Sequence, residues 1–140
     1  MVSCTAEGIL AGLNEGQRQA VTLPPGPLLV LAGPGSGKTR TLTARAAYLI
    51  AARGVPPARL LCVTFTNKAA EEMRFRLEGL LGREAEDIWI HTFHAACLRI
   101  LRKYGAAIGL PPDFVVADEA LQETIWRRVI ERRNLSLEQY

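Results

Sequence analysis

A glycine-rich turn set between an apolar run and a helical pattern constrains the fold of this chain more than any other feature. Residues 28–32 form a continuous apolar run, which is typical of a strand buried on both faces. Three glycines follow within residues 33–37, and apolar residues spaced three and four apart then predict a helix over 38–53, capped by Gly54. A strand, a tight turn and a helix in this order indicate an α/β fold with a parallel sheet.

The same alternation continues along the chain. It predicts further strands at 60–65 and 88–90 and helices at about 14–21, 69–80, 93–104 and 118–133, the last with Leu121, Ile125 and Val129 facing inward. A break rich in glycine and proline at 105–113 is the expected boundary between two regions. With 49% hydrophobic residues among 140, the chain has enough apolar content to form a core.

Charge and cysteine content exclude some function classes and leave others open. The net charge of +3 permits an anionic partner without requiring one. Cys4, Cys62 and Cys97 show no metal-binding or disulfide spacing, which favours reduced thiols in the cytoplasm. No apolar run approaches the ~20 residues that span a bilayer, so we expect no membrane partner.

The glycine-rich turn has the chemistry of a phosphate site. Glycines let backbone N–H groups point into one concavity, where the positive end of the following helix adds to the attraction for a triphosphate. Lys38 would neutralise the β and γ phosphates, and the Thr39 hydroxyl would ligate Mg²⁺. The strict P-loop pattern has glycine where this chain has Ala32, and a turn without a ligand remains the alternative. The predicted site comprises Ala32, Gly33, Pro34, Gly35, Ser36, Gly37, Lys38 and Thr39.

Four segments in order resemble the opening motifs of UvrD/Rep/PcrA-type superfamily 1 DNA helicases: residues 13–21, 32–40, 63–73 and 92–94. The resemblance implies a P-loop NTPase (RecA-like) parallel sheet with flanking helices over residues 10–108. It also implies that residues 109–140 begin a helical inserted subdomain.

Within that resemblance, two residues match those that contact the nucleotide base. Gln17 matches the glutamine that reads the adenine edge, since its amide can both donate and accept a hydrogen bond. Arg40 matches the arginine that stacks on the base. ATP and Mg²⁺ are therefore the implied cofactors, although spacing alone would equally suit Gln17 as a solvated helix residue.

The third and fourth motifs imply contacts with single-stranded DNA where two strands end. Short polar side chains can hold phosphates there, and Phe65 offers a face for a base, worth ~1–3 kcal/mol. From the residues alone, Phe65 also fits a core aromatic and Lys68 a solvated helix residue. The family usually has glycine where this chain has His91. The implied DNA contacts are Thr64, Phe65, Thr66, Asn67, Lys68, Thr92, Phe93 and His94.

The resemblance implies the N-terminal part of an ATP-dependent DNA helicase. Such an enzyme couples ATP hydrolysis to 3′ to 5′ movement on single-stranded DNA and unwinds duplex from single-strand/double-strand junctions.

Residues 114–119 imitate a Walker B strand, but we expect Asp118 to be a helix N-cap. The Walker B carboxylates and arginine fingers are then missing from the chain, which alone should hydrolyse little or no ATP. A truncated or accessory module that binds nucleotide or DNA without motor activity is the alternative. A P-loop kinase is a second rival, but it would have no use for the segments at 13–21 and 63–73.

Overall fold

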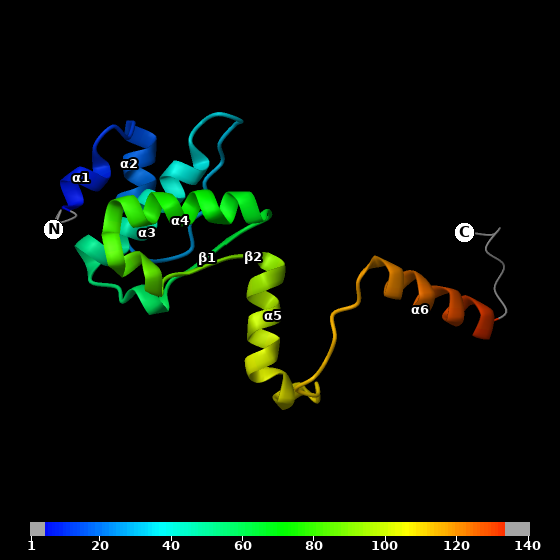
Figure 1. Cartoon of the computed structure of the whole chain (residues 1–140). Helices are drawn as coiled ribbons and strands as arrows, with labels where there is room; N and C mark the ends of the chain where they lie inside the picture. The colour runs from blue at the N-terminus through cyan, green and yellow to red at the C-terminus, as the bar shows by residue number, and fades with distance from the viewer. Residues whose placement is uncertain (1–4, 134–140) are drawn as a thin grey trace. The chain divides into compact units, whose positions relative to one another are not determined.

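The computed structural model describes residues 5–133, in which helices predominate (Figure 1). The chain divides into two compact units between Arg99 and Ile100. The first unit contains α1 (Ala6–Leu10), α2 (Glu15–Thr22), α3 (Lys38–Arg53), β1 (Leu61–Thr64), α4 (Asn67–Leu81), β2 (Trp89–Thr92) and the beginning of α5 (Phe93–Tyr104), with 3₁₀ turns at Pro57–Arg59 and Gly82–Asp87. The second unit contains the end of α5, a 3₁₀ turn at Gly105–Ile108 and α6 (Glu119–Arg132).

The sheet of the first unit is a parallel pair of strands. β1 and β2 pair in register from Leu61 opposite Trp89 to Thr64 opposite Thr92. Parallel strands require a crossover, and α4 provides it and contacts both strands. The predicted α/β class and the strands predicted at 60–65 and 88–90 are therefore confirmed, with small shifts at the ends.

Helices α2, α3 and α4 share one apolar core with the strands. Met73 and Leu77 of α4, Ile90 of β2 and Val21 of α2 are almost completely buried. Ala47 of α3 lies in the same cluster, and its small side chain lets the neighbouring helices approach closely. The core therefore fixes α3, which begins at the glycine-rich turn, against the α4 crossover between the strands.

The strand predicted at 28–32 is wrong. These residues have irregular backbone, and Leu29 and Leu31 are 82% and 86% exposed. A continuous apolar run becomes a buried strand only where neighbouring strands pair with it. In the described part of the chain, β1 and β2 pair with each other and neither pairs with this run. The glycine-rich turn is therefore entered from an irregular segment.

The predicted limits of α3 are confirmed by its caps. The helix begins at Lys38 after Gly37 and ends at Arg53. Gly54 follows in the left-handed region with a φ of 65°, and its N–H donates to the Ile50 carbonyl. Glycine adopts this conformation at low cost, which explains why the helix ends there.

The last helix keeps its predicted cap but not its predicted burial. The Asp118 carboxylate accepts the Leu121 N–H at 2.8 Å, so residues 114–118 lead into a helix and do not form a Walker B strand. Leu121, Ile125 and Val129 were expected to face inward, yet they are 41–48% exposed, because no element described in the second unit covers this face of α6. Among residues 5–133, no helix is long and apolar enough to cross a membrane.

Candidate functional site

The glycine-rich turn forms a loop that only glycine can build at low cost. Gly35 and Gly37 have φ angles of 73° and 81°, in the left-handed region that other residues rarely adopt. The Ser36 hydroxyl donates to the Gly33 carbonyl at 2.7 Å and tightens the turn. The loop ends where α3 begins, so its N–H groups lie at the positive end of a 16-residue helix.

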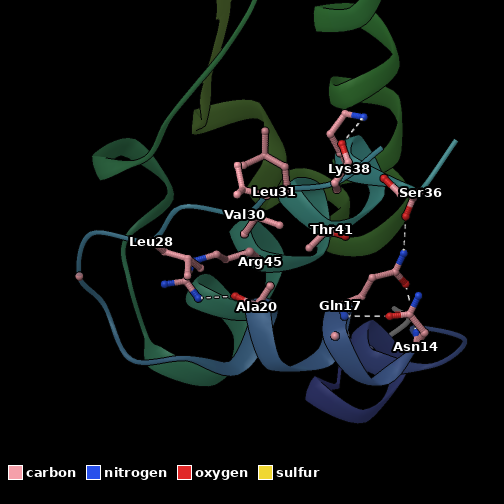
Figure 2. A pocket seen from close by; sticks show the side chains of 14 residues that line it. Asn14, Gln17, Ala20, Leu28, Val30, Leu31, Ser36, Lys38, Thr41 and Arg45 are labelled. Atoms are coloured by element: carbon pink, nitrogen blue, oxygen red, sulfur yellow. Dashed lines mark hydrogen bonds between the residues drawn. The ribbon is translucent and has the colours of Figure 1, made fainter. Parts of the chain in front are cut away.

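The Lys38 ammonium group lies against the carbonyl oxygens of the same loop. Its Nζ donates to the Gly33 carbonyl at 2.7 Å. It also donates to the Ala32 carbonyl at 3.2 Å (Figure 2). Its partners are therefore neutral, and the side chain is exposed. A cation held over a loop at the start of a helix fits a phosphate, which would offer it a stronger charge-assisted hydrogen bond. Thr39 is half-buried in the first turn of α3, beside the same loop.

Gln17 joins α2 to the glycine-rich loop of residues 32–39, hereafter the phosphate loop. Its backbone N–H and its Oε1 form a reciprocal capping box with Asn14, at 2.9 and 3.1 Å. Its Nε2 donates to the Ser36 carbonyl at 2.9 Å. An amide group has two N–H donors and two lone pairs, so one donor and one lone pair are left over from these bonds. Gln17 is therefore a pre-oriented amide at the edge of the loop rather than a freely solvated helix residue.

Arg40 lies on the same side of the loop as Gln17. A methyl group added to Gly37 would lie 2.9 Å from Nε2 of Gln17 and 3.9 Å from Cβ of Arg40. The Arg40 guanidinium donates to the Ala11 carbonyl at 3.4 Å and stays exposed. The structure thus brings together the two residues that the sequence assigns to the base and the loop that it assigns to the phosphates.

The close approach at Gly37 makes a substitution there costly. In Gly37→Ala an L-residue would have to adopt a φ of 81° with its methyl group 2.9 Å from Gln17 Nε2. We expect the free energy of unfolding to fall by ~1–2 kcal/mol, measured by urea denaturation. Gly16→Ala is the control, since Gly16 is in α2 without a positive φ and its nearest atom is 3.7 Å away. A Gly37→Ala variant as stable as Gly16→Ala would contradict the prediction.

The residues expected to contact DNA gather at the carboxyl ends of β1 and β2. Because Thr64 pairs with Thr92, the residues that follow, Phe65 and Phe93, come side by side with ring centroids 5.2 Å apart. Phe65 is 86% exposed and Phe93 45%. The alternative of Phe65 as a core aromatic is therefore wrong, and an aromatic face is available to a stacking partner.

Two threonines of this edge also begin the helices that follow the strands. Thr66 Oγ1 accepts the Ala69 N–H of α4 at 3.1 Å, and Thr92 Oγ1 accepts the Ala95 N–H of α5 at 3.2 Å. A hydroxyl that accepts in this way still has its proton to donate. Thr66 is exposed and Thr92 is buried. The remaining predicted contacts lie around them, half-buried at Thr64 and exposed at Asn67, Lys68 and His94.

The sequence matches the family model described as UvrD/REP helicase N-terminal domain over residues 13–140. The chain belongs to the UvrD/Rep helicase family. It is 50% identical over 137 residues to the ATP-dependent DNA helicase PcrA of Leuconostoc citreum, with 97% of this chain and 18% of that relative covered. Identity is 50% over 127 residues with PcrA of Bacillus subtilis (91% and 17% covered) and 48% over 136 residues with the ATP-dependent DNA helicase UvrD1 of Mycobacterium tuberculosis (96% and 18% covered).

Membership of the UvrD/Rep family confirms the resemblance inferred from the motifs and gives the chain the P-loop NTPase fold. The chain spans less than a fifth of the length of the relatives compared above.

His91 departs from the glycine that is usual in the UvrD/Rep family, and β2 accommodates it without a break. The strand continues in register through Thr92. His91 Nε2 lies 3.4 Å from Nη1 of Arg99, whose guanidinium also stacks 4.4 Å from the centre of the Trp89 ring. Burial, together with the charges of Arg99 and Arg74, lowers the pKa of His91. A lowered pKa favours the neutral imidazole at neutral pH, and in that form Nε2 can accept the Arg99 N–H.

One residue near the phosphate loop lies outside the four sequence segments that resemble the UvrD/Rep family. Arg45 of α3 lines the same open pocket of about 580 Å³ as Gln17 and Lys38, and its guanidinium reaches the end of α2 (Figure 2). The only signal in the sequence is the pair Pro24 and Pro25 after α2, because prolines leave helix carbonyls without donors. That signal does not say which side chain supplies the donors.

Proposed function

We propose that this chain is the nucleotide-binding and DNA-binding N-terminal part of an ATP-dependent DNA helicase. The observation that carries the proposal is the hydrogen bond from Gln17 Nε2 to the Ser36 carbonyl. It joins an amide suited to an adenine edge to a loop suited to phosphates, so one nucleotide can occupy both. The relatives named above are ATP-dependent DNA helicases, which supports the same assignment.

The residues of the loop fit Mg²⁺–ATP in a particular way. Lys38 would exchange its two carbonyl partners for the β and γ phosphates, and loop N–H groups would hold the remaining oxygens. Residues 5–133 contain no cluster of three or more His, Cys, Asp or Glu side chains able to hold a metal ion. Mg²⁺ would therefore rest on phosphate oxygens and the Thr39 hydroxyl, which suits a cation that keeps several waters. Bound there, it would neutralise charge on the phosphates.

Single-stranded DNA is the partner that fits the carboxyl ends of β1 and β2. Phe65 would stack on a base, while Thr66, Asn67, Lys68 and the start of α5 would contact phosphates. In the whole protein, ATP hydrolysis at the loop would drive 3′ to 5′ movement along the strand and unwinding from a single-strand/double-strand junction. Residues 109–140 would begin the inserted subdomain, and the chain alone would lack the groups that complete hydrolysis.

Gln17→Ala tests the nucleotide half of this proposal. Losing the amide should lower the affinity for ATP by roughly fivefold to tenfold, because a hydrogen bond to the base worth about 1–1.4 kcal/mol is lost. The affinity for tripolyphosphate, which has no base, should change less than twofold. Both affinities are measured by isothermal titration calorimetry with Mg²⁺ present.

Gln17→Glu is the matched variant in this test. It keeps an acceptor for the Asn14 N–H and removes the donor to the Ser36 carbonyl, so the loss of ATP preference should persist while α2 keeps its cap. Equal losses of ATP and tripolyphosphate in both variants would contradict base recognition by Gln17. Failure of the wild-type chain to bind either ligand would contradict the nucleotide-binding function itself.

A further inference from the structure

Arg45 holds the end of α2 through several hydrogen bonds at once. It lies in α3 about two helical turns after Lys38, and its side chain crosses to the neighbouring helix (Figure 2). Nη1 donates to the carbonyls of Ala20, Leu23 and Val21 at 2.9, 3.1 and 3.2 Å, and Nη2 donates to the carbonyl of Pro24 at 3.2 Å.

The carbonyls at the end of α2 need a donor because two prolines lie just beyond the helix. In a continuing helix, the Ala20 and Val21 carbonyls would accept from the backbone N–H groups of residues 24 and 25. Both positions are proline, which has no N–H. A guanidinium presents five donors in a fixed fork, so one arginine can satisfy several carbonyls together. Arg45 therefore replaces the backbone donors that the two prolines remove.

The same short helix carries Gln17 at its other end. α2 is only 8 residues long, about 12 Å, and the Gln17 amide at its start is bonded to Ser36 of the phosphate loop. Packing between α2 and α3 involves Val21 and small residues such as Ala47, and apolar contact has no directional preference. Hydrogen bonds are directional, so the bonds from Arg45 restrict where the C-terminal end of α2 can lie along α3.

We propose that Arg45 is a positioning residue for recognition of the nucleotide base. By holding the C-terminal end of α2 against α3, it places the Gln17 amide at the distance from the phosphate loop that lets one nucleotide reach both. This inference rests on the nucleotide-binding function proposed above. It assigns Arg45 an effect on selectivity for the base and no contact with the ligand.

The test compares Arg45→Met with the wild-type 140-residue chain, since methionine keeps an apolar stem and removes every donor. The affinities for ATP and for tripolyphosphate are measured by calorimetry with Mg²⁺, and their ratio is the readout. We expect the ratio to fall by roughly fivefold to tenfold, as in Gln17→Ala, with the tripolyphosphate affinity within twofold of wild type. In the double variant the ratio should fall no further, because both changes act through the same amide.

Arg53→Met is the matched control. Arg53 is also in α3 and approaches the end of α2, but with one bond, to the Thr22 carbonyl at 3.5 Å. The ratio of ATP affinity to tripolyphosphate affinity should stay at the wild-type value in Arg53→Met.

Arg45→Lys is the second variant, to be used if circular dichroism shows Arg45→Met unfolded. A single ammonium group cannot span the four carbonyls, so its ratio should lie between those of wild type and Gln17→Ala.

The possible results separate the inference from the function on which it rests. A folded Arg45 variant with the wild-type ratio would overturn the positioning role, as would equal losses of ATP and tripolyphosphate or additive effects with Gln17→Ala. Each of these leaves nucleotide binding intact in the wild-type chain. A wild-type chain that binds neither ligand would overturn the proposed function and the inference together.

Discussion

Replacing Lys38 by alanine is expected to weaken binding of a Mg²⁺–ATP analogue by about 100-fold or more. Lys38 Nζ now donates to two neutral carbonyls of the loop, and phosphate oxygens would replace them as charged partners. Each charge-assisted hydrogen bond is worth about 1.5–3 kcal/mol, and two of them give roughly the stated loss. Calorimetric titration with a non-hydrolysable analogue measures the change.

Lys68→Ala is the control for charge in the Lys38 experiment. Lys68 is likewise an exposed lysine in the first turn of a helix. That helix is α4, however, so Lys68 lies outside the phosphate loop. It should bind the analogue within twofold of wild type. Because the Lys38 side chain is exposed, both variants should unfold at nearly the wild-type urea concentration. A Lys38→Ala variant that binds within threefold of wild type would show that the loop does not hold the triphosphate.

Phe65→Ala is expected to weaken binding of a fluorescent oligo(dT) by roughly 5- to 150-fold, measured by anisotropy at fixed salt. The estimate follows from the ~1–3 kcal/mol that base stacking on an aromatic contributes. Phe65 is 86% exposed and its ring packs against the half-exposed Phe93 ring, so its removal opens no buried cavity. The free energy of unfolding should therefore change little.

Phe75→Ala provides the matched control for stacking. Phe75 is 77% exposed on α4, away from the start of the helix where Phe65 lies. It should leave oligo(dT) binding unchanged, so a general loss of exposed aromatic surface cannot imitate the effect. Equal weakening by both substitutions, or by neither, would rule out Phe65 as the stacking residue.

The parts of the fold that sequence predicts well depend on neighbours a few residues away. Gly54 and Asp118 end and begin their helices where predicted, because a cap is made from local backbone groups. The run at 28–32 was predicted wrongly because burial of a strand depends on which distant strands pair with it. The same dependence explains α6, whose apolar residues were expected inward and are exposed.

The candidate sites also differ in whether nearby or distant residues determine them, and only the first kind could be predicted from sequence. The phosphate loop could be predicted because its glycines, Lys38 and Thr39 are consecutive and their conformation is local. An aromatic at the end of a strand looks the same in sequence whether it is buried or exposed, so only the structure decides between the two readings of Phe65. Arg45 gave no recognisable pattern, since its partners are backbone carbonyls more than 20 residues away.

The capping role of Thr66 changes how mutations at the carboxyl ends of β1 and β2 must be interpreted. Its oxygen already accepts the Ala69 N–H, so Thr66→Ala would fray the first turn of α4 at a cost of ~0.5–2 kcal/mol even without DNA. Weaker binding by that variant would not distinguish a lost contact from a displaced helix start. Serine keeps the oxygen and its proton, and valine keeps the shape without either. A contact made by the hydroxyl can therefore be inferred only from a comparison of these substitutions, corrected for the helicity that each one loses.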